Sequence, residues 1–231
     1  MNARALRHFI SHLGYATVMT SEEKQEGLWR NCEDSIRHAL THFSAGAYEH
    51  DAFHHHKWAL LSVAHAAEVY GNLLLCAFNP KHPERADGHY PSLDGVRKLL
   101  ENHQHLTRAE SLVFQDVFEN VAAQRNTLMH MPAPEFPVVT DAARALLALL
   151  HIVRRRTGLP TKEFFDQDPP VEQDILEHIG WRDHESWHKV AEQLAAAEHG
   201  EENLRGCDYC GSFAIPNGGP CQACFQEAKE G

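Results

Sequence analysis

Hydrophobic residues recur at helical spacing along most of the chain, and no stretch alternates between apolar and polar residues as a half-buried strand would. This pattern predicts a long helix over about 25–43 and a second over about 51–78. A third opens near Thr107, and a fourth covers about 140–156. Because all four are long and amphipathic, they favour an all-α, antiparallel helical bundle.

The third long helix has the clearest boundaries. Thr107 and Glu110 form a capping box, in which the hydroxyl and the carboxylate satisfy backbone N–H groups at a helix start. Pro132 follows at the other end and cannot continue a helix. The apolar face that this helix presents to the core consists of Phe114, Val117, Phe118, Val121 and Leu128.

Prolines and composition divide the chain into four parts. Residues 1–24 form an N-terminal segment, and residues 25–158 form the helical bundle. Pro160 and the Pro169-Pro170 pair mark the start of a helical extension over 159–204, with short helices expected at about 171–179 and 183–199. The remaining residues, 205–231, contain four of the six cysteines.

The formal net charge of −11 argues against a broad, sequence-independent grip on nucleic acid, which requires many lysines and arginines. Any contact with RNA is therefore expected to be local. We expect a cytoplasmic protein without a membrane segment, because no signal peptide is recognisable. The most apolar stretch, 59–78, is also interrupted by His65, Glu68 and Asn72.

The cysteines of the C-terminal segment are spaced as in a zinc ribbon. Two Cys-x-x-Cys pairs, Cys207/Cys210 and Cys221/Cys224, are separated by ten residues rich in glycine and proline. Two such pairs predict one closed tetrahedral site for a structural Zn²⁺, with no position left for water. The partner of the ribbon stays open at this point: RNA, another protein or the chain's own helical body.

Arg125 starts from the apolar face of the third long helix, four residues after Val121. An arginine in such a place is costly unless it is paired. Glu68, on a polar stripe of the second helix, is the candidate partner.

Asn126 and His130 follow Arg125 and share one face of the helix. His130 lies five residues after Arg125 and on another face, but the end of the helix before Pro132 would let it swing back toward Arg125. The segment thus supplies a fixed cation, an orienting amide and a group with a pKa near neutrality. RNA cleavage without a metal ion uses these groups.

The segment Arg125-Asn126-Thr127-Leu128-Met129-His130 resembles the Arg-Asn-x-x-x-His motif of the HEPN superfamily (higher eukaryote and prokaryote nucleotide-binding domains). The resemblance covers about residues 25–158 and implies a HEPN-like bundle and a homodimer. It also implies metal-independent endoribonuclease activity, with Arg125, Asn126 and His130 of two subunits at a shared cleft. Glu68, which the spacing places as the partner of Arg125, completes the candidate catalytic site. Such proteins often serve as toxins or in antiviral defence, so an antitoxin or another partner protein is one expected kind of partner.

Other interpretations of the same residues remain open. Arg125 and Glu68 also suit a structural pair, with His130 at a helix C-terminus that favours basic side chains. In that case the chain would be a non-catalytic HEPN dimer that binds RNA or nucleotides or docks a protein. The segment 184–188 has the His-Glu-x-x-His spacing of zinc proteases, but its flanks are charged. Trp181 and Trp187 are expected to anchor the extension on the bundle.

Overall fold

The computed structural model describes residues 22–48, 52–79, 91–130, 139–157, 175, 181–217 and 219–225. It confirms a mostly helical chain with a cluster of cysteines near its C-terminus. The elements are α2 (Glu22–Tyr48), α3 (Ala52–Phe78), α4 (Leu93–Asn102), α5 (Arg108–Val113), the π-helix η1 (Phe114–Phe118), α6 (Glu119–His130), α7 (Val139–Thr157), α10 (Trp181–His199), the 3₁₀ helix η2 (Glu201–Asn203), β1 (Leu204–Arg205) and β2 (Ile215–Pro216).

Helix α3 lies at the centre of the helical body and contacts α2, α4, α6 and α7. Nearly all of its residues from Ala59 to Cys76 are buried, because it is apolar on most of its circumference. Its length and composition would suffice to cross a membrane, but 83% of the apolar window is buried inside the structure. Burial of this kind is typical of the core helix of a soluble protein.

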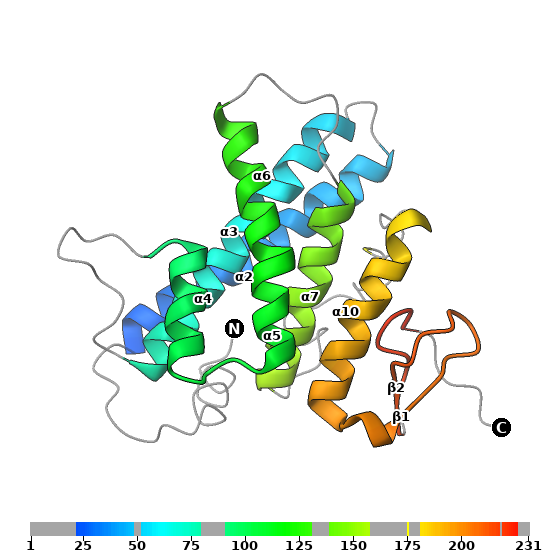
Figure 1. Cartoon of the computed structure of the whole chain (residues 1–231). Coiled ribbons are helices and arrows are strands. Elements are labelled where there is room, and N and C mark those ends of the chain that lie inside the picture. The colour runs from blue at the N-terminus through cyan, green and yellow to red at the C-terminus, as the bar shows by residue number, and fades with distance from the viewer. Residues whose placement is uncertain are drawn as a thin grey trace.

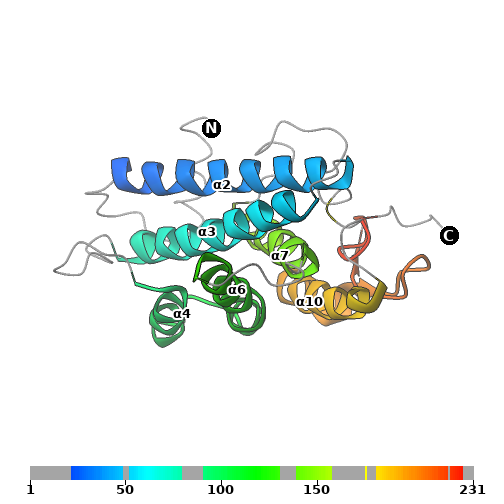
Figure 2. The ribbon, with the colours of Figure 1, turned by 90° about the horizontal axis from the view of Figure 1, so that it is seen from above.

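Helices α2 and α3 form an antiparallel hairpin that covers the other helices. In Figure 2 this pair runs along the picture, whereas α4, α6 and α7 are seen nearly end-on beneath it. The hairpin therefore crosses the second layer obliquely (Figure 1). Close approach between the layers needs Gly71 of α3, where a Cβ would lie 2.7 Å from Cγ1 of Val96 in α4.

The third long helix begins at the expected capping box. The hydroxyl of Thr107 accepts the backbone N–H of Glu110, and the Glu110 carboxylate accepts the backbone N–H of Thr107. The helix runs through α5, η1 and α6 to His130, and the five apolar residues expected on its inner face are all buried. The π-helix was not predicted, because helical spacing of apolar residues does not distinguish a wider turn.

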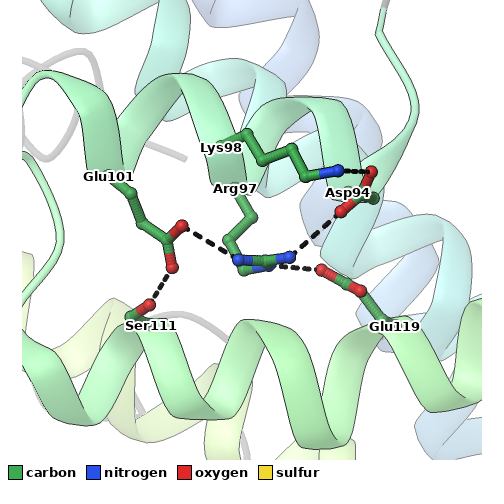
Figure 3. A network of polar contacts seen from close by, with 6 residues as sticks. All are labelled: Asp94, Arg97, Lys98, Glu101, Ser111 and Glu119. Carbon is green, nitrogen blue, oxygen red and sulfur yellow. Dashed lines mark hydrogen bonds and ion pairs between the residues drawn. The ribbon is translucent and has the colours of Figure 1, made fainter.

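Helix α4 is held to this long helix by an arginine surrounded by carboxylates (Figure 3). The guanidinium of Arg97 donates to Glu119 at 2.5 Å, to Glu101 at 2.9 Å and to Asp94 at 3.0 Å. The hydroxyl of Ser111 in α5 also donates to Glu101. Because Arg97 is 14% exposed and fully paired, this network fixes α4 in place.

After α7 the described chain resumes at α10, which packs on α5 and α7 (Figure 1). The short helix expected at about 171–179 lies outside the described residues, except for the buried, helical Ile175. The small sheet of the C-terminal segment then pairs β1 with β2 in antiparallel register, Leu204 opposite Pro216 and Arg205 opposite Ile215.

Candidate functional site

The four cysteines of the C-terminal segment converge on one point, and their sulfur atoms all lie within 4.8 Å of one another. Sγ of Cys207 is 3.6 Å from that of Cys224, and Sγ of Cys210 is 3.7 Å from that of Cys221. Four thiolates about 2.3 Å from one metal ion in a tetrahedron lie about 3.8 Å apart. The four side chains therefore fit a closed metal–thiolate centre.

Both Cys-x-x-Cys turns have the same backbone geometry. The N–H of Gly211 donates to the carbonyl of Cys207, and the N–H of Phe225 donates to that of Cys221, both at 2.8 Å. Gly211 and Phe225 each follow the second cysteine of their pair and adopt positive φ angles of 75° and 60°. This conformation is strained for a residue with a side chain, and the ring of Phe225 lies against His151 of the helical body, 5.6 Å between centroids.

Burial alone would raise the pKa of the Cys207 thiol. Backbone N–H groups of Cys210 and Tyr209 point at its sulfur, however, and hold that pKa below its ordinary value. The hydroxyl of Ser212 also lies 3.1 Å from Sγ of Cys210 and 3.4 Å from Sγ of Cys221. The polar groups thus favour the thiolate form of Cys207, whereas burial raises the pKa of the Cys210 thiol in spite of its contact with Ser212.

The ribbon docks on the chain's own helical body, which answers one question that the sequence left open. The indole N–H of Trp187 in α10 donates to the carbonyl of Ala223 at 2.9 Å. The carboxylate of Glu192 accepts the backbone N–H of Phe213 at 2.6 Å. From α7, the guanidinium of Arg154 donates to the amide oxygen of Gln222. Contacts between ribbon and body therefore come from two helices.

His151 of α7 lies at the centre of this junction. Its ring centroid is 5.6 Å from that of Trp187 and 5.6 Å from that of Phe225. Burial and the neighbouring charge of Arg154 hold the pKa of His151 well below its ordinary value, so the ring is neutral at pH 7. His151 therefore packs as a neutral ring between the helical body and the ribbon, with its Nδ1 3.0 Å from Nη2 of Arg154.

The structure brings together Glu68 and Arg125, as the sequence predicted. Nη1 of Arg125 in α6 donates to Oε2 of Glu68 in α3 at 2.5 Å, and the two side chains are 27% and 28% exposed. Longer contacts of 3.3 and 3.4 Å join the guanidinium to the amide oxygen of Asn126. Asn126 therefore orients Arg125, and the cation lies half-buried with an outer edge in solvent.

His130 is the last residue of α6, and its side chain lies outside the described part of the structure. Asn126, one helical turn before it, is exposed. Met129, the preceding residue, is 62% exposed. The end of α6 thus presents Arg125, Asn126 and Met129 on an open surface. The catalytic roles of Arg125, Asn126, His130 and Glu68 stay predictions.

Two further arginines near the end of α7 pair with a buried carboxylate. Nε of Arg156 donates to Oε1 of Glu110 at 2.8 Å and Nη2 to Oε2 at 2.9 Å, while Arg155 pairs with Oε1 at 2.9 Å. Glu110 is fully buried. Burial would raise the pKa of this carboxyl, but Arg156 and the backbone N–H of Thr107 hold it below its ordinary value. Glu110 thus caps a helix and carries a buried ion pair.

Sequence reasoning missed several residues that hold the ribbon in place. Glu192, Gln222 and Arg154 are ordinary polar residues whose spacing carries no signal, and their roles follow only from the packing of α10 and α7. Trp187 was expected as an anchor, and it is completely buried. The side chains of Trp181 and of the protease-like residues His184 and Glu185 lie outside the described part of the structure.

Comparisons with protein-family models, with curated proteins and with solved structures gave no match.

Proposed function

We propose that the helical body is a HEPN-type, metal-independent endoribonuclease that acts as a homodimer, with a structural zinc ribbon docked on its side. One observation carries the proposal: Arg125 is held by Glu68 and Asn126 at the open end of α6, with His130 five residues further on. A cation fixed in this way, together with the imidazole of His130, would provide the charge and the proton transfer that the reaction requires.

In this mechanism His130 removes the proton of the ribose 2′-hydroxyl, and the oxygen attacks the adjacent phosphorus. The bond from phosphorus to the 5′-oxygen breaks, and the leaving oxygen takes up a proton from an imidazolium. The products are a 2′,3′-cyclic phosphate and a 5′-hydroxyl. Arg125 binds the non-bridging oxygens as their charge grows, and its planar fork matches them. Glu68 and Asn126 are positioning residues.

The pairing of Arg125 with Glu68 has a consequence for affinity. The pair is neutral overall, so it attracts RNA weakly, in keeping with the net charge of −11. A phosphate must share the guanidinium with Glu68, through the N–H groups at its solvent edge. Two motifs from two subunits would place two such cations at one cleft, and we expect a dimeric mass by light scattering.

Zinc is the metal we propose for the cysteine centre. A set of four thiolates selects soft or borderline cations, and closed sites of this kind are structural. Because the ribbon contacts α7 and α10, we assign it to the stability of the protein rather than to its chemistry. No catalytic metal is proposed at Arg125. A role as a toxin or antiviral effector predicts that expression slows growth and that His130→Ala restores it.

The alternative is a non-catalytic HEPN dimer that binds RNA or nucleotides or docks a protein. The full compensation of Arg125 by Glu68 is the observation that favours it, since a purely structural pair would have the same geometry.

A set of variants separates the two functions. We expect Arg125→Ala to lower kcat/KM for RNA cleavage by about 10²- to 10³-fold, as removal of a group that stabilises transition-state charge does. Glu68→Gln releases the cation, so it should strengthen RNA binding while slowing cleavage. Arg37→Ala removes an exposed arginine paired with Glu33 in α2 and is the control. Wild-type protein that binds RNA without cutting it would establish the non-catalytic module.

A further inference from the structure

A cavity of about 330 Å³ lies where the start of α5 meets the end of α7. It is lined by the turn before α5 and by the last arginines of α7, and the lining residues that matter here are Gln104, His105, Thr107, Glu110, Arg155 and Arg156. Its volume lies within the range of small-molecule sites, about 300–1,000 Å³.

The carboxylate in this cavity has no capacity left for a ligand. Oε1 of Glu110 accepts from Nε of Arg156 and forms an ion pair with Nη1 of Arg155 at 2.9 Å. Oε2 accepts from Nη2 of Arg156 and from the backbone N–H of Thr107. The backbone carbonyl of His105 also accepts from Nη2 of Arg156, at 2.7 Å. The strong acceptors at this wall are therefore already used.

The cavity has more hydrogen-bond donors than the acceptors around it use. Arg155 uses only Nη1, in its contacts with Glu110 and with Oγ1 of Thr107 at 3.5 Å. Among the described residues nothing accepts from its Nε and Nη2, from Nη1 of Arg156 or from the hydroxyl proton of Thr107. A ligand that satisfies these groups must bring acceptors and no donors of its own.

The balance of charges at the cavity also favours an anionic ligand. Two guanidinium groups face one carboxylate, and Glu110 is the only acidic residue in the described part of the chain that forms an ion pair with either arginine. A surplus positive charge in a partly buried wall is costly unless an anion accompanies it. The chain as a whole has a net charge of −11, so this local excess of positive charge contrasts with the rest of the protein.

We propose that this cavity binds a phosphate group, as orthophosphate or as the phosphate of a mononucleotide. A tetrahedral phosphate offers only acceptors at pH 7 apart from its own acidic proton, and its oxygens match the fork of Arg155. Arg155 is the main ligand, Arg156 and the Thr107 hydroxyl complete the site, and Glu110 positions both arginines.

The site is separate from Arg125. Thr107 and Arg125 are 18 positions apart on one long helix, which at a rise of 1.5 Å per residue corresponds to roughly 27 Å. Binding at the cavity therefore does not depend on the endoribonuclease proposal.

The test is calorimetric titration of the full, zinc-loaded chain with inorganic phosphate, AMP and adenosine. Arg155→Gln removes the main ligand without emptying the core, because Arg156 still pairs with Glu110. Arg108→Gln is the matched control: it removes the same charge from an exposed residue next to Thr107. Thermal unfolding of each variant checks that the fold persists.

We expect saturable binding of phosphate and AMP, no binding of adenosine, and a loss of about tenfold to hundredfold in affinity for Arg155→Gln alone. Tighter binding of AMP than of phosphate would identify a nucleotide as the ligand, and equal binding would identify phosphate itself. The proposal is overturned if wild-type protein binds neither, if adenosine binds as well as AMP, or if Arg108→Gln weakens binding as much as Arg155→Gln.

Discussion

The indole N–H of Trp187 donates to the carbonyl of Ala223, which lies between Cys221 and Cys224 in the second Cys-x-x-Cys turn. Trp187 has no exposed surface, so one side chain of α10 both fills the interface between ribbon and body and satisfies a backbone group of the ribbon. The ribbon is therefore part of the folded unit rather than a separately tethered module.

This interface predicts a graded loss of stability. Trp187→Phe keeps most of the apolar contact but leaves the carbonyl of Ala223 without its donor, at a cost of about 1–3 kcal/mol in the free energy of unfolding. Trp187→Ala should cost about 3–5 kcal/mol, because it also opens a cavity. Urea unfolding followed by circular dichroism measures both. Equal stability of Trp187→Ala and wild type would show that the ribbon does not dock as described.

The metal centre predicts one Zn²⁺ per chain. We expect Cys221→Ser to lose the ion in elemental analysis, whereas Cys32→Ala, at a buried cysteine of α2 far from the cluster in sequence, should retain it. Removing zinc should change the fluorescence of Trp187, which bonds to the ribbon, while most of the helical circular dichroism persists, because the ribbon itself contains no long helix. Retention of one zinc per chain by Cys221→Ser would contradict the four-cysteine site.

The contact between Glu68 and Arg125 predicts a measurable coupling. Both side chains are a little over a quarter exposed, so solvent screens the pair and its coupling energy should be about 0.5–1 kcal/mol. A double-mutant cycle with Glu68→Gln and Arg125→Ala, measured by denaturant unfolding, gives this number. A coupling of zero would mean that the two groups do not hold each other in solution.

The buried pair of Glu110 and Arg156 predicts a dependence of stability on pH. The folded-state pKa of Glu110 lies below its ordinary value of 4.5, so its contribution is fully present above that pH. It is lost as pH falls through the lower, folded-state pKa. The stability difference between wild type and Glu110→Gln should thus be about 3–5 kcal/mol at pH 7 and shrink in acid. A difference that stays constant to pH 3 would contradict the account.

The sequence predicted those features that depend on local spacing. The capping box of Thr107 and Glu110, the long helices and the two Cys-x-x-Cys turns are all of this kind. The link between Arg125 and Glu68 was also predictable, because a charge on an apolar face requires a partner and α3 offers few polar residues.

Features that depend on tertiary packing were not predictable. The capping box indicated a helix start, but not that Glu110 would be fully buried and shared by Arg155 and Arg156. The docking of the ribbon depends on Glu192 and Gln222, which look like ordinary surface residues in the sequence. The helices also extend beyond their predicted ends: α2 runs from Glu22 to Tyr48 rather than over about 25–43, because packing against α3 stabilises turns that local propensity leaves undecided.

The central claim is tested most directly by incubating a structured RNA with pure protein in EDTA and identifying the ends of the products. The account predicts cleavage by wild type, with 2′,3′-cyclic phosphate and 5′-hydroxyl ends, and no cleavage by His130→Ala. Zinc content is followed in parallel, since the chelator also acts on the ribbon. Cleavage by both proteins, or by neither, would contradict the role of His130 and with it the ribonuclease account.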